Sequence, residues 1–548
     1  MNEGGIVRAA EEAGFKLTQV EAAALRAIAA EGCFDGLEFR KSAEGIDLTH
    51  ELAAWFPSVW RNDTLAETDN VSKHHELYEK APFPIISGAL VEWVLTKEAA
   101  KYLRNIHLGN TKVAGPVNST RCELDCNVRL VDCVFQDLLK ISGQIRGELS
   151  LTGICAGTVV LSGDISAGVY LNDVQCRLRL SRYFGGLYLE ALKSPFVKIY
   201  GVYTPQDMVR FRDCAVSEIE IRGRGLACTI RMDHCKVDEV FLEGWTEDDY
   251  SMPFFEASGL TVEGTCSVAH VQGASIRETV IGGDFKIADV RSTKTFYLPL
   301  EKTIMLSNVE VTGTLSIDMN PDANGIHLTF QNVRAYLYED RPEDLRAIDR
   351  LEADGLAYQE LVSWGDEDIQ KRTEWLLKQS GEPFPVASWR RIAMLLRRRG
   401  KFHEARKMLI EGERQRRYMQ GKGTGACCWS WLLRTSIGYG WELWRVGLFA
   451  IVLVLVGTGV ASVGMERGLL SETTERPHYV SFNPLVYSID EALPIIDLRH
   501  SSRWLPTGKG WDGRAVQVYF WIHTILGWVI ATLFVIGFTG VARKAEDG

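Results

Sequence analysis

Short pairs of apolar residues, each pair separated by a single residue, recur about every ten positions between residues 104 and 338. This alternation places both side chains of a pair on one face of a β-strand. A helix would instead need apolar residues three or four positions apart. The repeat therefore predicts a long series of short strands. The pairs are Val128/Leu130, Leu139/Ile141, Leu149/Leu151, Val159/Leu161, Val169/Leu171, Leu178/Leu180, Leu187/Leu189, Val197/Ile199, Val209/Phe211, Ile219/Ile221, Ile230/Met232 and Val240/Leu242, and less regularly Phe285/Ile287, Phe296/Leu298, Ile304/Leu306, Leu315/Ile317 and Leu328/Phe330.

The spacing of the pairs predicts a β-solenoid over residues 104–338. The region resembles a degenerate pentapeptide-repeat β-helix, and this resemblance implies a right-handed coil. Strands ten residues apart, with a weaker five-residue beat between them, indicate square coils of about twenty residues. Glycines such as Gly147, Gly157 and Gly168 fall near strand ends, where turns need a permissive residue. Leucine-rich and hexapeptide solenoids fit less well, and the hexapeptide beat is missing.

The first 103 residues are expected to form a mostly helical module that caps the solenoid. Residues 22–30 have a helical composition, and residues 87–103 have apolar side chains on one helical face. A solenoid must cover its open ends, so we expect the helix at 87–103 to lie against the first coil.

Residues 339–425 are expected to form a basic helical collar. Leu345, Ile348 and Leu351 fit one helix, and the segment 389–417 fits a helical hairpin, either an ordinary one or one of the tetratricopeptide type. The chain as a whole carries a net charge of −10, but residues 390–422 hold twelve basic side chains against three acidic ones. We expect these basic side chains to face anionic lipid head groups, above all Arg397, Arg398, Arg399, Arg414, Arg416 and Arg417. Nucleic-acid binding is not expected, because no aromatic residues are interleaved with the basic ones.

Residues 426–548 are expected to be a membrane domain with two spans, at about 445–465 and 516–541. Val446–Met465 and Ala515–Ala542 contain no charged residue, and each is long enough to cross a bilayer. Lysine and arginine lie before the first span and after the second, which predicts cytoplasmic termini and an outward loop at 466–514. All twelve cysteines precede the first span, as expected for a reducing cytoplasm.

The outward loop contains the candidate site. Asn483-Pro484 can begin a short helix over 484–496, which Pro494 should bend or end. A span, a short re-entrant helix and a second span make the layout of a two-span channel subunit. If several copies surrounded an axis, an acidic ring at Asp490 or Asp497, with Glu491 adjacent, would favour cations. The alternative is a loop that lies on the membrane surface.

One further candidate, His523, lies near the start of the second span. An ionisable residue within a span is a functional candidate, although a histidine near the interface can simply bind water.

Motifs for chemistry are weak. The chain has no P-loop, HExxH or GxSxG sequence, and Cys122, Cys126 and Cys133 do not have the spacing of a metal site. His74-His75-Glu76 fits a solvated loop better than a metal site. These observations do not favour an enzyme, and we expect no cofactor and no metal.

Three segments resemble one family of bacterial membrane proteins, common in actinobacteria. The family joins a pentapeptide-like β-helix, which in some relatives is named an oxidoreductase, to a two-span C-terminal domain. The matching segments are 87–135, 389–417 and 482–506 (FNPLVYSIDEALPIIDLRHSSRWLP), followed by the span that contains Trp528. The chain departs from the family at Arg499-His500, where a polar, often glutamine-containing sequence is expected. The oxidoreductase name implies a cofactor site, but no residues here are recognisable as one.

Three functions are compatible with these observations. In the first, the cytoplasmic solenoid senses or binds an unknown ligand or protein, and the collar couples it to a homo-oligomeric, cation-channel-like domain. In the second, the chain is a static membrane-tethered scaffold without a pore. In the third, it is a membrane-associated oxidoreductase.

Overall fold

The computed structural model describes residues 3–36, 83–176, 186–203, 208–224, 229–245, 253–290, 303–320, 325–340, 347–362, 368–378, 386–420, 444–473, 481–493 and 498–546, and the single residues Phe39, Ser42 and Ala323. The chain divides into two compact units, Met1–Gly381 and Glu382–Gly548. Each unit is described by itself.

The first unit begins with a small helical region. Helix α1 (Glu3–Glu12) precedes α2 (Gln19–Glu31), which confirms the helix expected at residues 22–30. Thr18 begins α2 with a capping box, because its side chain accepts the N–H of Glu21 and the Glu21 carboxylate accepts the N–H of Thr18. The region also contains two short strands, β1 (Cys33–Asp35) and β2 (Ile85–Ser87), which pair in parallel with the first solenoid strands.

The cap expected at residues 87–103 is interrupted. It consists of α6 (Gly88–Val94) and α7 (Lys97–Ala100). Thr96 separates them in an extended conformation and donates its hydroxyl to the carbonyl of Trp93. The prediction of a single helix at residues 87–103 was therefore wrong, although its apolar face at Val91, Val94 and Leu95 is buried as expected.

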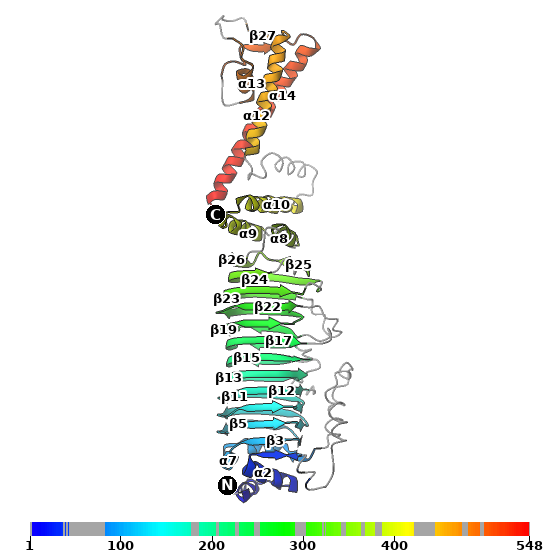
Figure 1. The fold of residues 1–548 in the computed structure, drawn as a ribbon, viewed down its shortest axis with the longest axis vertical. Coiled ribbons are helices and arrows are strands. Elements are labelled where there is room, and N and C mark those ends of the chain that lie inside the picture. Colours follow the sequence, from blue (N-terminus) through cyan, green and yellow to red (C-terminus); the bar gives the residue numbers. More distant parts are fainter. Residues whose placement is uncertain are drawn as a thin grey trace. The chain divides into compact units, whose positions relative to one another are not determined.

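A parallel β-solenoid of about nine turns follows (Figure 1). Its strands stack coil on coil; for example, Val159 pairs with Leu139 of the coil before and with Leu187 of the coil after. The strands are β3 (Ile106–Gly109), β4 (Lys112–Ala114), β5 (Val117–Leu124), β6 (Val128–Val131), β7 (Val134–Phe135), β8 (Leu138–Ile145), β9 (Leu149–Thr152), β10 (Cys155–Ala156), β11 (Thr158–Ile165), β12 (Val169–Cys176), β13 (Leu187–Tyr203), β14 (Met208–Arg212), β15 (Ala215–Arg224), β16 (Thr229–Asp233), β17 (Lys236–Trp245), β18 (Phe254–Ser258), β19 (Thr261–Val262), β20 (Cys266–Ala269), β21 (Gly273–Ile281), β22 (Phe285–Val290), β23 (Thr303–Met319) and β24 (Ile326–Asp340).

The predicted strand pairs form the core of this solenoid. Every described member of those pairs is at most 2% exposed. Leu178/Leu180 and Phe296/Leu298 lie outside the described residues. The apolar-x-apolar repeat thus predicted both the strands and the side of each strand that faces inward.

The end of the solenoid differs from the prediction. Residues 348–361, expected within a helical collar, form β25 (Ile348–Glu352) and β26 (Leu356–Leu361), which continue the parallel ladder from β24. The helix expected from Leu345, Ile348 and Leu351 was therefore wrong. Helix α8 (Asp368–Leu377) follows.

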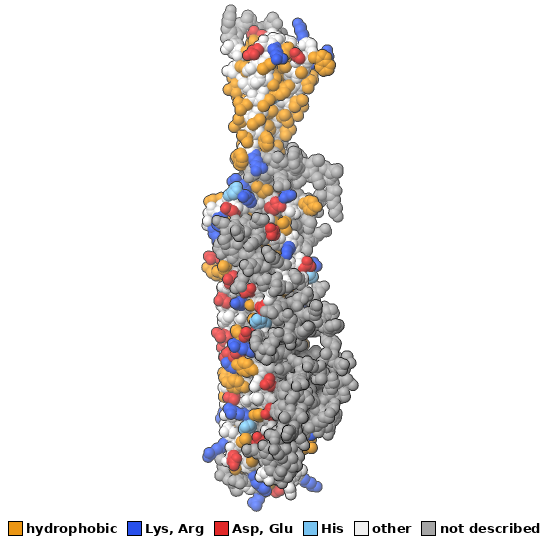
Figure 2. Space-filling view, turned by 45° about the vertical axis from the view of Figure 1, so that its right-hand side comes forward, with side chains coloured by type: hydrophobic (Ala, Val, Ile, Leu, Met, Phe, Trp, Pro, Cys, Tyr) orange, Lys and Arg blue, Asp and Glu red, His pale blue; other side chains and the backbone are white. Residues whose placement is uncertain are grey.

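The second unit is helical. Helices α9 (Ala387–Arg398) and α10 (Phe402–Gln420) form the expected hairpin. Helix α12 (Trp444–Glu466), α13 (Pro484–Ala492) and α14 (Gly510–Glu546) follow, and a small antiparallel pair, β27 (Leu470–Glu472) and β28 (Trp504–Pro506), joins the loops between them. Helix α12 and residues Gly510–Val535 of α14 are long and apolar enough to cross a membrane. Hydrophobic side chains dominate the visible surface of these helices (Figure 2).

Candidate functional site

The short helix α13 packs against both long apolar helices. The predicted start at Asn483 is confirmed: its side chain accepts the N–H groups of Leu485 and Val486. The helix ends at Ala492, four residues earlier than the predicted 496, with Leu493 extended. Leu493 precedes a proline, and the proline ring disfavours a helical conformation in the residue before it.

Ser488 connects α13 to the middle of α12. Its side chain is fully buried, and its hydroxyl donates to the carbonyl of Val454 at 2.9 Å. Gly457 makes this approach possible, because a Cβ at that position would lie 2.2 Å from Ser488 Oγ. Val454 is ten residues from the start of α12 and twelve from its end. Helix α13 therefore reaches halfway along α12.

His523 connects α14 to Ser488 of α13. Its Nε2 lies 3.2 Å from the carbonyl oxygen of Ser488, and its Nδ1 lies 3.3 Å from the hydroxyl of Tyr519. A carbonyl oxygen only accepts, so Nε2 donates and Nδ1 accepts the proton of Tyr519 in the neutral ring. His523 is 1% exposed, so the structure gives it protein partners rather than solvent.

Glu491 makes a second connection to α14. The hydroxyl of Thr524 donates to Glu491 Oε2 at 2.8 Å. One turn of α14 further on, a Cβ on Gly527 would lie 1.9 Å from the carbonyl oxygen of Ala492. The C-terminal end of α13 thus lies directly on the backbone of α14, and only a glycine permits this contact.

Asp490 organises the loop that follows α13. Its carboxylate accepts the backbone N–H groups of Leu498, His500 and Ser501 at 2.6, 2.8 and 2.7 Å. His500 in turn accepts the N–H of Asn483 on its Nε2, which joins this loop to the start of α13. The structure thus gives Asp490 a positioning role. Asp497, the other predicted ring residue, lies outside the described residues.

One buried polar group in this region has no partner among the described residues. Tyr487 is fully buried between α13 and the long helices, in a cluster with Ala461, Leu470 and Phe520, and its hydroxyl makes no hydrogen bond. A buried hydroxyl without a partner costs free energy, so the region contains an unsatisfied donor close to Asp490 and Glu491 on the same helix.

The basic side chains predicted to face lipid are in two different situations. Arg397, Arg398 and Arg399 are exposed at the C-terminal end of α9. Arg414 and Arg416 form ion pairs with Glu411 and Glu413, one turn earlier on α10, at 3.3 and 2.6 Å. The side chain of Arg417 lies outside the described residues.

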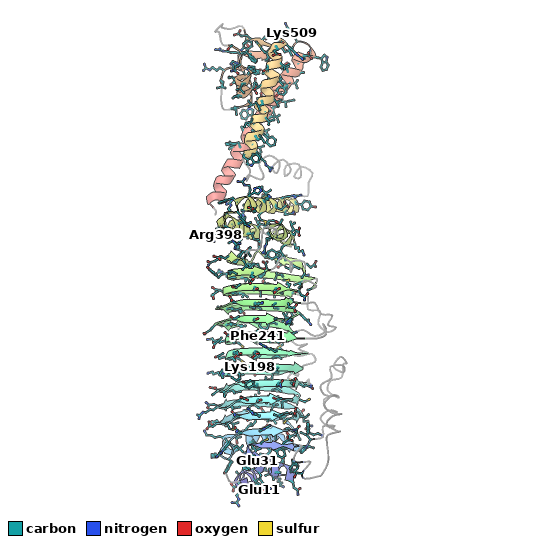
Figure 3. All side chains as sticks on the ribbon, viewed as in Figure 1. Glu11, Glu31, Lys198, Phe241, Arg398 and Lys509 are labelled. Carbon is teal, nitrogen blue, oxygen red and sulfur yellow. The ribbon has the colours of Figure 1, made fainter. Side chains whose placement is uncertain are left out.

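The outer surface of the solenoid carries a column of charged and aromatic side chains. Lys198 and Phe241, two coils apart in one column, flank Glu220, and Figure 3 labels both. Lys198 forms ion pairs with Glu218 and Glu220, and the guanidinium of Arg222 stacks on the ring of Phe241 at 4.5 Å. This column of charged and aromatic side chains is a surface that a protein partner could contact.

No group of three His, Cys, Asp or Glu side chains in the described part of the chain could hold a metal ion. Burial raises the pKa of the Cys133 thiol to about 11 and that of Cys266 to about 12, so these thiols are poor nucleophiles. The predicted metal alternative at residues 74–76 lies outside the described residues.

A pocket lies between α2, α6 and the first coil of the solenoid. It is lined by apolar side chains, among them Leu25, Leu90 and Leu130.

Comparison with protein-family models, curated proteins and solved structures gave no match. The function must therefore be argued from the residues themselves.

Sequence reasoning found the carboxylates and His523 but missed their partners. Ser488, Thr524 and Gly527 lie opposite these groups only after α13 folds back between the two long helices. Gly457 and Ala461 are both buried in α12, Gly457 against α13. The sequence feature that could have identified these partners is the presence of small and hydroxyl-bearing residues in otherwise apolar helices.

Proposed function

We propose that the chain is an integral membrane protein of the bacterial inner membrane whose two-span domain assembles into a homo-oligomeric cation pathway. Helices α12 and α14 are the spans and α13 is a re-entrant helix between them. The β-solenoid, which we take to be right-handed, pentapeptide-like and cytoplasmic, binds a ligand or protein partner. Both termini would then lie in the cytoplasm.

Membrane insertion is supported by the surfaces of the two long helices. Their most apolar windows have mean hydropathies of 2.5 and 1.8, yet only 17% and 22% of these windows are buried. A soluble protein would hide such surfaces in its core. Lipid or other copies of the chain must therefore cover them.

The main support for the pathway is how far α13 reaches along the two spans. Its contacts at Val454 and Gly527 lie near the middle of both spans. Non-helical backbone at this depth is tolerated only where protein buries it or where it lines a water-filled cavity. One chain covers α13 from the side of α12 and α14 and leaves Leu485 and Leu493 exposed. Further copies around an axis would cover the open side and enclose a wet path.

The charge at the end of α13 favours cations. The C-terminus of a helix carries a partial negative charge, and here it lies at Ala492, next to Glu491. A carboxylate beside that helix end strengthens the negative potential where the chain turns back. We therefore place Glu491, rather than Asp490, at the pathway.

The collar connects to this domain through α10. Ile410 packs against Val446 of α12 and Leu533 of α14, so movement of α10 would reach both spans. In this way a partner bound to the solenoid could alter the pathway.

Flux through the full chain in liposomes tests the proposal. We expect K⁺ or Na⁺ flux from wild-type protein and a clear loss in Glu491→Gln, with no loss in Glu466→Gln, an exposed carboxylate at the end of α12. Inserted protein that carries no cation and remains monomeric on cross-linking would contradict the pathway and favour the scaffold without a pore. A visible absorption band in purified protein would favour the oxidoreductase instead.

A further inference from the structure

Helix α10 has two distinct faces. One packs on α9: Ala405 and Met408 are buried, and a Cβ on Gly412 would lie 3.0 Å from the ring of Trp389. The face turned away from α9 contains Ile410, the residue that contacts Val446 and Leu533. Helix α10 thus lies between α9 on one side and the two spans on the other.

Basic side chains surround Ile410 on this second face. In a helix, residues three and four positions apart are neighbours on one side. Arg406 and Arg414 are four positions from Ile410, and Lys407 is three positions from it. Arg406 and Lys407 are exposed. Glu413 is the one acidic residue at such a spacing, and it forms an ion pair with Arg416, so the face of α10 that meets the spans is mainly basic.

Aromatic side chains lie at the edges of the same face. Phe402 is 67% exposed and Tyr418 is 78% exposed. Exposed aromatic rings beside exposed Lys and Arg are typical of helices that lie in a membrane interface. Val446 belongs to the first turn of α12, so the contact with Ile410 is at an end of that span, where head groups would be.

We infer that this face of α10 binds anionic phospholipid head groups, and that the bound lipid holds α10 against the ends of both spans. The inference rests on the membrane insertion proposed above. It goes beyond a general attraction of the collar to the membrane, because it assigns the lipid to Arg406 and Lys407 and makes the lipid a regulator of the contact at Ile410. A lipid is favoured over a nucleic acid because the site adjoins the spans and because its positive charges flank an apolar contact.

Native mass spectrometry of the full chain in detergent, titrated with phosphatidylglycerol or phosphatidylcholine, tests the assignment. We expect retention of phosphatidylglycerol in preference to phosphatidylcholine. Arg406→Gln/Lys407→Gln should bind phosphatidylglycerol about 30-fold more weakly, since each basic residue near an anionic surface contributes about 1 kcal/mol. The matched control is Arg277→Gln/Lys286→Gln, which removes the same charge from exposed positions on β21 and β22 of the solenoid and should retain wild-type affinity.

Three results would overturn the inference. Equal losses in the two double variants would show a diffuse charge effect rather than a site on α10. Equal affinity for the two lipids would remove the role of lipid charge. Displacement of phosphatidylglycerol by RNA at comparable phosphate concentration would indicate a general polyanion surface. Flotation with neutral vesicles tests insertion separately: a chain that does not float contradicts the proposed function, whereas one that floats but does not discriminate between the lipids contradicts only this inference.

Discussion

The guanidinium of Arg372 on α8 donates two hydrogen bonds, each of 2.6 Å, to the carboxylate of Asp340 at the end of β24, and both side chains are 5% exposed. Arg372 also lies over the ring of Trp375 at 5.0 Å. The pair therefore fixes α8 on the last coils of the solenoid. Such a pair holds the two elements in one relative position, because separating them would leave a buried charge without its partner.

Replacing Arg372 with alanine should release α8 from the solenoid end. Loss of one partner of a buried pair costs about 3–5 kcal/mol, so hydrogen exchange of the α8 amides should accelerate by about 100-fold or more. The control is Arg350→Ala, which removes the ion pair with Glu352, where the side chains are 55% and 35% exposed. That change should cost less than about 1 kcal/mol. Similar exchange rates in the two variants would mean that the Asp340 pair does not hold α8.

A second prediction concerns the acidic corners of the solenoid. Asp132 and Asp173 have φ angles of 51° and lie at corners one above the other, with Gly153 between them. Burial, and then the negative charges of Asp35 and Asp173, raise the pKa of the Asp132 carboxyl. A carboxyl with a raised pKa stabilises the fold only while it is protonated, so this stability is lost as the pH rises through that pKa.

Asp132→Asn should therefore stabilise the chain at pH 7 and change its stability little at a pH below the ordinary aspartate range. Asparagine tolerates the left-handed conformation that position 132 requires. Asp132→Ala should instead destabilise by about 1 kcal/mol, because alanine does not. Melting temperatures of the full chain at the two pH values measure both effects. A stabilisation that did not depend on pH would rule out the charge as its cause.

The solenoid was predictable from sequence because each strand buries a residue pair whose spacing depends only on β geometry. The two collar residues Ile348 and Leu351 show the limit of such reasoning. With Leu345 they make three apolar residues at intervals of three, which fit a helix. However, β24 has an open parallel edge, and Ile348 and Leu351 pair there with Ile326 and Leu328. Whether a short apolar segment becomes helix or strand was thus decided by a neighbour distant in sequence.

The candidate site was predictable only in part. Asp490, Glu491 and His523 stand out because carboxylates and imidazoles are rare near spans. Their roles depend on partners 8 to 35 residues away, such as Leu498, Thr524 and Ser488. The sequence pattern gives no indication of how the loop after α13 turns back, so it could not distinguish the loop-binding Asp490 from Glu491.

Asp490 leads to a third prediction, on the loop rather than the pathway. Asp490→Ala removes a carboxylate that accepts three backbone N–H groups, and two of these donors, those of His500 and Ser501, are in partly buried hydrogen bonds. We expect a local loss of at least about 2 kcal/mol, seen as faster cleavage of the 498–501 segment by an added protease. Asp512→Ala, an exposed carboxylate in the first turn of α14, is the control and should leave cleavage unchanged. Slow cleavage in both variants would mean that other contacts hold the loop.

The docking of α13 is tested by two glycines on one helix. A Cβ on Gly457 would lie 2.2 Å from Ser488 Oγ and 2.5 Å from His523 Cε1, whereas a Cβ on Gly459 would meet no atom within 4 Å among the described residues beyond its own stretch of helix. Gly457→Ala should therefore push α13 away from α12, break the Ser488–Val454 bond and reduce cation flux. Gly459→Ala should keep both, and it stabilises α12 slightly because alanine is the better helix former. Insertion, checked by flotation, should be the same for both variants, since neither change alters the apolar length of the span. Equal flux in the two variants would mean that the position of α13 against Val454 does not control conduction.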